Sequence, residues 1–274
     1  MVLPAAIRRL GLGGVPKRTV LIPNQWDGSV QHYYHFMLGY LFPIFRWMDK
    51  HEQTPLSVRD CGPMNAWFEL VGETHDVDIL TVGDVLHILA GNLTPLEVLP
   101  GLDDPQTFSS RQLRRFALRT SEIAASKGVR AQKADVLVSA RKTKDSFYTS
   151  ELSEAQGSGP ERRSVPNLDD IVASWNDDRV TSVDMSTLNI YEQIRMHNHA
   201  RVLIGQHGAG LTSMLWMSPG SAVIEILPPV PTHTQRIFAD LARAMGLHYT
   251  VVSQAGLHDP VDADQLTRAL ESVW

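Results

Sequence analysis

From about residue 134 onward, short apolar and β-branched runs alternate with amphipathic segments. The apolar runs are ADVLVSA (134–140), RVTSVDM (179–185), RVLIG (201–205), SAVIEIL (221–227) and LHYTVVS (247–253). Between them, segments 186–199 and 232–246 repeat apolar residues at helical spacing. Strands that alternate with helices are typical of a parallel sheet covered by helices. This part of the chain is therefore predicted to be an α/β domain.

The first half follows the same pattern less regularly. It contains TVLIP (19–23), helical spacing over 34–45, strand-like PLSVRD (55–60) and VDILTV (77–82), and a long helix from Ser109 or Ser110 to Gly128. A chain of 274 residues can bury two cores of ordinary size. We expect two domains, 1–128 and 129–274, with the last helix, 262–273, able to pack on either one.

Composition excludes several functional classes. The 25 basic and 30 acidic residues give a net charge of −5 and form no basic stripe, so nucleic acid is not an expected partner. The longest apolar run, 36–48, contains Arg46 and is shorter than the ~20 residues that span a bilayer, which predicts a core helix.

The N-terminal segment MVLPAAIRRLGLGG has arginines but no apolar stretch long enough for a secretion signal. With Cys61 as the only cysteine, the chain suits a reducing compartment. A cytoplasmic protein is therefore expected. The N-terminal segment is either a frayed tail or a peripheral contact with the inner face of the membrane.

The stretch VLIGQHGAGLTSMLWMSPGSAVIEIL (202–227) sets one histidine among glycines between two strand-like runs. Glycine allows close backbone approach, and the N–H groups at a helix N-terminus favour anions such as phosphate. In open α/β sheets, ligands bind beyond the carboxyl ends of the strands. The spacing G-x-x-G-x-G is not the dinucleotide fingerprint, and a turn that needs glycine only for packing would look similar.

The string GQHGAGLTSMLWMSPGSAVIEI resembles the signature of glycosyltransferase family 61. HYYHFMLGYLFPIF looks like the family's N-terminal histidine-bearing helix, and VLVSARK followed by RRSVPNLDDIV looks like its arginine and arginine-asparagine segments. Two features depart from the family pattern. A long polar insertion occupies 141–164, and Ala140 stands where a second arginine is common.

The resemblance implies a GT-B arrangement, in which two Rossmann-like domains face a cleft. It also implies an inverting transfer from a nucleoside diphosphate sugar, expected to be a UDP-sugar, without a metal cofactor. The acceptor would be a glycan, a lipid-linked sugar or a protein hydroxyl. The altered segment 140–163 keeps an alternative open, a catalytically idle nucleotide-sugar-binding module that recruits a partner enzyme.

The resemblance also implies a set of donor-binding residues. A guanidinium can grip diphosphate oxygens in bidentate fashion, and the alternative for both arginines is a solvated loop position. Glu225 interrupts an apolar strand and is expected to bind a ribose diol or to pair with Arg201 or Arg236. The donor-binding candidates are Arg141, Arg163, Asn167, Gln206, His207, Gly208, Ala209, Gly210 and Glu225.

The catalytic base should come from the opposite domain. His35 is the first candidate, because Gln31 and His35 would share a helix face, and His32 could substitute. Packing of His35 between Tyr34 and Phe36 is the alternative, and Asp27 is the second candidate for the base.

Two Asp-x-Asp triplets resemble a metal–diphosphate arrangement. The first, in HDVDIL (75–80), is expected to enter a strand and the second, in VDADQL (261–266), to cap a helix. No metal site is therefore predicted.

Overall fold

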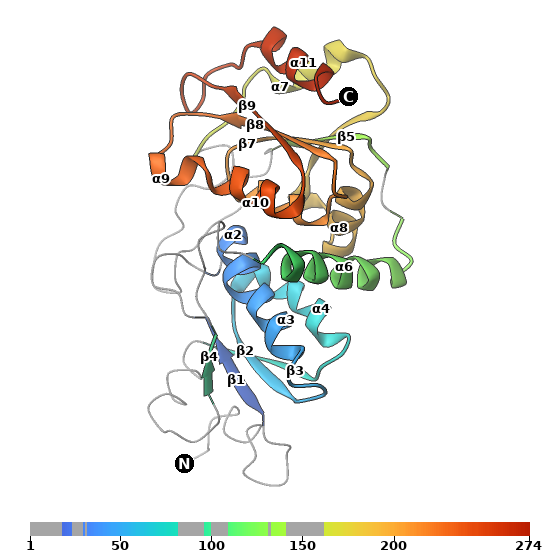
Figure 1. The fold of residues 1–274 in the computed structure, drawn as a ribbon, viewed down its shortest axis with the longest axis vertical. Coiled ribbons are helices and arrows are strands. Elements are labelled where there is room, and N and C mark those ends of the chain that lie inside the picture. The colour runs from blue at the N-terminus through green and yellow to red at the C-terminus, as the bar shows by residue number, and fades with distance from the viewer. Residues whose placement is uncertain are drawn as a thin grey trace. The chain divides into compact units, whose positions relative to one another are not determined.

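The computed structural model describes residues 18–23, 30, 32–81, 96–99, 109–130, 133–140 and 162–274. Contacts divide the chain into two units, Met1–Asp103 and Asp104–Trp274 (Figure 1). The division differs from the boundary expected at 128/129, because helix α6 (Ser110–Ser126) belongs to the second unit.

The second unit is built on a five-stranded parallel sheet in the order β6-β5-β7-β8-β9. All five strands predicted from the sequence are confirmed. The central strands are buried along almost their whole length because helices cover both faces, which explains their continuous apolar runs. The strands are β5 (Val136–Ala140), β6 (Val180–Asp184), β7 (Val202–Gln206), β8 (Ala222–Leu227) and β9 (His248–Ser253).

Helices cover both faces of this sheet (Figure 1). On one face, α7 (Leu168–Trp175) and α11 (Ala263–Glu271) bury Leu168, Ile171 and Leu266 against the strands. On the other face lie α8 (Ile190–His199) and α10 (Ile237–Met245). The described part of this unit also contains the 3₁₀ helices η5 (Met185–Thr187) and η6 (Ala209–Trp216), and α9 (Thr232–Gln235).

Helix ends follow the expected chemistry with one exception. Ser109 caps α6, and Gly246, with φ of 75°, ends α10 as predicted. Helix α8 starts later than the expected cap at Ser186 or Thr187. Asn189 is the cap, and its side chain accepts from the backbone N–H groups of Tyr191 and Glu192. An Asn followed by Glu three residues later makes a capping box at this point.

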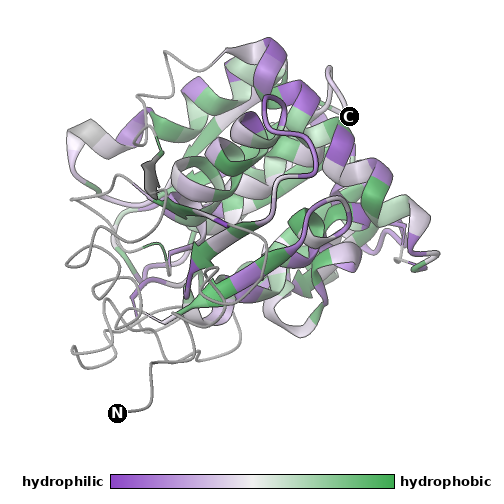
Figure 2. Cartoon of the chain, turned by 90° about the horizontal axis from the view of Figure 1, so that it is seen from below, coloured by the Kyte–Doolittle hydropathy of each residue, from purple (hydrophilic) through white to green (hydrophobic). Residues whose placement is uncertain are grey.

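Helix α6 is joined to the rest of the second unit by two polar contacts, of which the one to Thr120 is buried. Trp216 Nε1 donates to Thr120 Oγ1 at 2.9 Å, and Asn198 Nδ2 donates to Ser121 Oγ at 2.9 Å. Thr120 is fully buried, as are the apolar side chains on the same face of the helix. Figure 2 shows helices with hydrophobic residues on one side and hydrophilic residues on the other, whereas α3 (Phe42–Met48) is buried on nearly all of its residues. The sequence revealed this amphipathic pattern but not the unit against which α6 packs.

The first unit has a four-stranded parallel sheet in the order β3-β2-β1-β4. Both units are therefore α/β, as predicted. Strand β4 was not expected from the sequence. The strands are β1 (Thr19–Ile22), β2 (Leu56–Arg59), β3 (Val77–Leu80) and β4 (Leu96–Val98); the helices are α2 (Tyr33–Phe36), the π-helix η1 (Met37–Leu41), α3 (Phe42–Met48), the 3₁₀ helix η2 (Gly62–Phe68) and α4 (Glu69–Gly72).

The apolar run 36–48 forms core helices, as predicted. Tyr40 links them to the sheet by hydrogen bonds. The fully buried Tyr40 hydroxyl donates to Leu21 O at 2.7 Å and accepts from Arg59 N at 2.7 Å, which joins η1 to β1 and β2. Within the described ranges, the helices are too short or too polar to cross a bilayer.

His197 in α8 should make the second unit sensitive to acid. It is fully buried, and its Nδ1 donates to Gln193 O at 2.7 Å. Burial lowers the pKa of His197 from 6.5 to about 4, although the bond to Gln193 opposes this shift. The unfolded chain therefore binds a proton that the folded chain excludes. The stability from this group is complete above pH 6.5 and is lost as the pH falls toward 4.

We predict that His197→Gln, which keeps an N–H donor, reduces this loss. Between pH 7 and pH 5, the free energy of unfolding in urea should fall by about 1–2 kcal/mol less in the variant than in the wild type. His248→Gln, at an exposed position, is the control and should behave like the wild type. Equal pH dependence in the wild type and His197→Gln would contradict the prediction.

Candidate functional site

The candidate site lies where the carboxyl ends of β5 and β7 meet. From β5 the chain crosses to β6 on one side, and it later returns to β7 on the other side. Strand order thus reverses between these two neighbours. Open α/β sheets bind ligands at such a switch point, beyond the carboxyl ends of the strands. The predicted glycine-histidine stretch follows β7 at this place.

Glycine is needed at two positions of this stretch, for different physical reasons. Gly208 has φ of 151° and ψ of 176°, a region of backbone space that is essentially restricted to glycine. Gly205 has an ordinary backbone, but an added Cβ would lie 3.0 Å from Leu211 Cδ2 and 3.6 Å from Ser139 Cβ. Glycine is therefore needed at 205 for close packing and at 208 for its backbone conformation. The apolar helix expected after them is the 3₁₀ helix η6, and Leu211 N donates to Gly208 O at 2.9 Å.

Gly208→Ala is expected to destabilise the second unit by about 1–3 kcal/mol, because alanine would be forced into that glycine-only region. Urea unfolding followed by circular dichroism measures the loss. Gly210→Ala is the matched control, since its added Cβ would meet only Ser139 Oγ, at an ordinary 3.6 Å. If both variants unfolded at the same urea concentration, the assigned role of Gly208 would be wrong.

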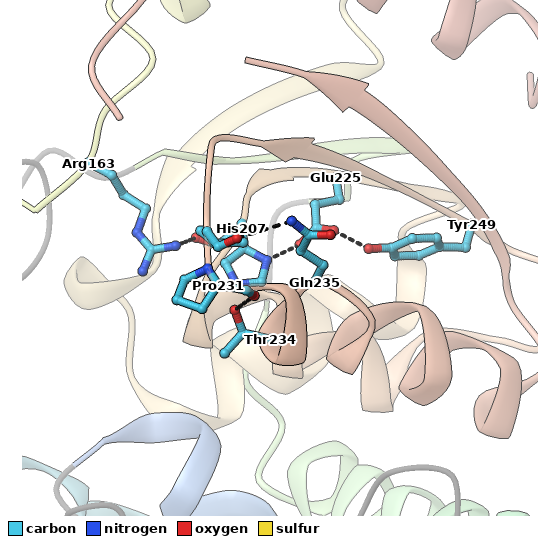
Figure 3. Close-up of polar contacts among 8 residues, drawn as sticks. Arg163, His207, Glu225, Pro231, Thr234, Gln235 and Tyr249 are labelled. Carbon is cyan, nitrogen blue, oxygen red and sulfur yellow. Dashed lines mark hydrogen bonds and ion pairs between the residues drawn. The ribbon is translucent and has the colours of Figure 1, made fainter. Parts of the chain in front are cut away.

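His207 is held by a carboxylate. The ring is nearly buried, and its Nδ1 lies 2.7 Å from Oε1 of the fully buried Glu225 (Figure 3). Because a carboxylate accepts, His207 Nδ1–H is the donor of this bond, so Nε2 is an acceptor while the ring is neutral. Phe238 of α10 contacts the ring edge-to-face, with centroids 5.2 Å apart.

Glu225 has other partners than those expected. Neither Arg201 nor Arg236 pairs with it. Its Oε2 accepts a hydrogen bond from the Tyr249 hydroxyl, so both carboxylate oxygens are bonded within the protein (Figure 3). A fully buried carboxylate needs such partners. Glu225 therefore contacts the site through His207. With both oxygens bonded within the protein, it does not present one to a ribose diol.

Arg163 contacts His207 and belongs to the same group of residues. The alternative of a solvated loop position is wrong for this residue, because only 7% of it is exposed. Its Nη1 donates to His207 O at 2.7 Å, and its buried Nε has no hydrogen-bond partner within the described residues (Figure 3). Burial lowers the pKa of Arg163 to about 10; neighbouring Arg162 adds to this shift and Glu225 opposes it. The guanidinium is thus a buried cation at neutral pH.

Two glutamines attach the Arg163 segment to the sheet. Gln206 Nε2 donates to Gln254 Oε1 at 2.6 Å and to Ser164 O at 3.1 Å, and Gln254 Nε2 donates to Ser164 O at 2.8 Å. These acceptors fix the orientation of the Gln206 amide. Its Oε1 is buried and has no hydrogen-bond partner in the described part of the chain.

Asn167 has its hydrogen-bond partners outside this group. Its Nδ2 donates to Val261 O at 2.8 Å and its Oδ1 accepts from Val261 N at 3.0 Å, so it clamps the start of α7 to the segment before α11. The role seen is structural. Ala209 and Gly210 lie in the first turn of η6, next to His207.

The structure does not bring the remaining candidates into this group. Arg141 and Asp27 are outside the described residues. His35 is a half-buried residue of α2 in the first unit, with ring centroids 5.7 Å from His32 and 5.6 Å from Tyr34. Helix α2 begins at Tyr33, and Gln31 is outside the described ranges.

The two Asp-x-Asp triplets have the structures that were predicted. The first enters β3, and Asp262 of the second caps α11 by accepting from Gln265 N at 2.9 Å. Over the described ranges, no group of three or more His, Cys, Asp or Glu side chains is placed to hold a metal ion.

Comparison with known proteins shows which proteins this chain resembles. The family model for glycosyltransferase 61 matches residues 33–224. EGF domain-specific O-linked N-acetylglucosamine transferase of Mus musculus is 33% identical over 94 residues, which cover 32% of this chain and 17% of that protein. The same enzyme of Pan troglodytes is 37% identical over 62 residues, 23% of this chain and 11% of that protein.

A plant protein is also similar. Xylan glycosyltransferase MUCI21 of Arabidopsis thaliana is 29% identical over 83 residues, 28% of this chain and 17% of that protein. Each match thus spans less than a fifth of the relative's own length. The family model, in contrast, covers most of the chain. The chain belongs to glycosyltransferase family 61.

Proposed function

We propose that the protein is a glycosyltransferase that takes its sugar from a nucleoside diphosphate sugar bound at the carboxyl end of β7. The observation that carries this proposal is the buried Arg163 guanidinium, whose Nε lacks a protein partner within the described chain, beside His207. A buried cation with an unused donor favours an anionic ligand. The glycine turn at Gly208 adds backbone N–H groups of a helix N-terminus.

The proposed reaction depends mainly on stabilising the charge of the leaving diphosphate, without a covalent intermediate. As the bond between sugar and diphosphate breaks, negative charge grows on the leaving diphosphate. Arg163 would bind its oxygens, and His207 would donate from Nε2 once its ring is protonated. Because these groups supply positive charge, we propose that no metal is required. Inversion at the anomeric carbon needs a base for the acceptor hydroxyl, for which His35 and Asp27 remain the candidates.

The nucleotide is proposed to be uridine. Gln206 offers a buried acceptor, Oε1, that lacks a donor among the described residues. Uracil presents an N3–H donor, whereas cytosine presents an acceptor at the same ring position. A base that reached Gln206 would therefore be selected by its hydrogen-bond pattern.

We propose a GT-B organisation for the two α/β units, in which the second unit binds the donor and the first unit binds the acceptor. The relatives are named for transfer of N-acetylglucosamine to EGF domains and for xylan glycosylation. For this chain we propose a glycan, a lipid-linked sugar or a protein hydroxyl as the acceptor.

The experiment incubates the protein with UDP-, GDP- and CMP-sugars, with and without EDTA, and measures donor hydrolysis and the melting temperature. We expect UDP-sugars to raise the melting temperature and to be hydrolysed slowly, with no effect of EDTA. At a ligand concentration 100 times the Kd, binding adds about 2.7 kcal/mol of stability. No response to any donor would reject the proposal. UDP binding without turnover on glycan, lipid-linked or protein acceptors would favour the idle binding module.

A further inference from the structure

Tyr249 in β9 hydrogen-bonds the carboxylate that holds His207 (Figure 3). No sequence pattern assigned it a role. The family match ends at residue 224, so Glu225 and Tyr249 both lie beyond it. This contact extends the candidate site across three neighbouring strands, from the residue that follows β7, through β8, to β9.

Sheet register explains how the three side chains meet. Glu225 lies opposite Gly205 in β7 and opposite Val251 in β9. Residues two positions apart on a strand share a face. His207 is two residues after Gly205, and Tyr249 is two residues before Val251. The two side chains therefore flank Glu225 diagonally on one face of the sheet.

The contact pattern restrains the carboxylate. Its Oε2 accepts from the Tyr249 hydroxyl and its Oε1 faces His207 Nδ1. Burial, followed by the charge of Glu225, raises the pKa of Tyr249 well above its usual range. The hydroxyl therefore stays a proton donor at neutral pH. A carboxylate held at one oxygen by a fixed donor can present only the other oxygen to the imidazole.

We propose that Tyr249 is a positioning residue: its hydroxyl fixes the orientation of Glu225, and Glu225 fixes which ring nitrogen of His207 carries the proton. In the neutral ring the proton is then on Nδ1, and Nε2 is the acceptor. Taking up a second proton at Nε2 turns that nitrogen into a donor toward a phosphate oxygen. This last step rests on the proposed function, whereas the position of the proton does not.

The test is the ¹⁵N NMR spectrum of the histidine rings, in which protonated and unprotonated ring nitrogens give distinct signals. The His207 signals are assigned by their loss in His207→Asn. We expect the wild type to carry its proton on Nδ1. In Tyr249→Phe, which removes only the hydroxyl, either carboxylate oxygen can still accept from His207 Nδ1–H, so this tautomer should persist. Tyr191→Phe in α8, added to the Glu225→Gln variant described next, is the matched control and should not change the tautomer of that variant.

Glu225→Gln tests the orienting role of the hydroxyl, because an amide presents either a donor or an acceptor to His207, according to its orientation. In Glu225→Gln, the Tyr249 hydroxyl should donate to the amide oxygen and leave the amide N–H facing His207. Nδ1 then becomes an acceptor and the proton moves to Nε2. In the double variant Glu225→Gln/Tyr249→Phe nothing holds the amide, so part of the proton population should return to Nδ1.

Activity gives an independent readout. Tyr249→Phe should lower kcat of sugar transfer roughly 10-fold with little change in KM, because the orientation of His207 matters most when charge develops. Absence of any turnover in the wild type would reject the proposed function and leave the NMR result standing. The positioning role would be overturned if Glu225→Gln kept its proton on Nδ1, or if Glu225→Gln and Glu225→Gln/Tyr249→Phe had the same tautomer populations.

Discussion

Alanine at position 207 is expected to lower kcat of sugar transfer about 10²- to 10³-fold. The backbone carbonyl of His207 accepts from Arg163 and its ring is oriented by a buried carboxylate, an arrangement suited to stabilising charge on a leaving diphosphate. The substitution removes the imidazole and also leaves Glu225 with an unsatisfied buried oxygen. Steady-state kinetics with a saturating UDP-sugar measures the loss in kcat.

His248→Ala is the control for this substitution, since His248 is an exposed residue at the start of β9. It should keep wild-type kinetics. Thermal unfolding of both variants separates a catalytic loss from a folding defect. A folded His207→Ala protein with full turnover would remove His207 from the mechanism.

Arg163→Lys should weaken UDP binding about 10- to 100-fold, although the positive charge is kept. A guanidinium can donate to His207 O and to diphosphate oxygens at the same time, whereas an ammonium has no planar fork. Loss of one charge-assisted hydrogen bond costs about 1.5–3 kcal/mol, which corresponds to that change in affinity. Titration calorimetry with UDP measures the Kd directly.

Arg162→Lys provides a close comparison, because Arg162 is the adjacent residue and is exposed. Its affinity for UDP should stay within about 2-fold of the wild type, since exposed charges contribute little. If Arg163→Lys and Arg162→Lys bound UDP equally well, diphosphate binding by Arg163 would be refuted.

Local sequence patterns were sufficient to predict most of the strands and helices described in the second unit. Central strands such as β7 and β8 are buried on both faces, so their apolar runs stand out in the sequence. Strand β4, in contrast, has only three residues, too few for a periodic signal. The unit to which α6 belongs depends on the partners of Thr120 and Ser121, which are far away in the sequence.

The sequence likewise predicted only part of the candidate site. His207, Gly208 and Gly210 are adjacent in the sequence, and their pattern indicated an anion site. The partners of Glu225 were not predictable, because they depend on the register of three parallel strands. Tyr249 carried no local signal. Strand alternation would have indicated it only after the pairing of β8 with β9 was known.

A crystal structure of the protein with UDP tests the central claim most directly. The account predicts that the diphosphate lies at the carboxyl end of β7, with its oxygens within hydrogen-bond distance of the Arg163 guanidinium and of the backbone N–H groups of Ala209 or Gly210. His207 Nε2 should face the same phosphate group. UDP bound elsewhere on the chain, with Arg163 and His207 making no contact to it, would contradict the account.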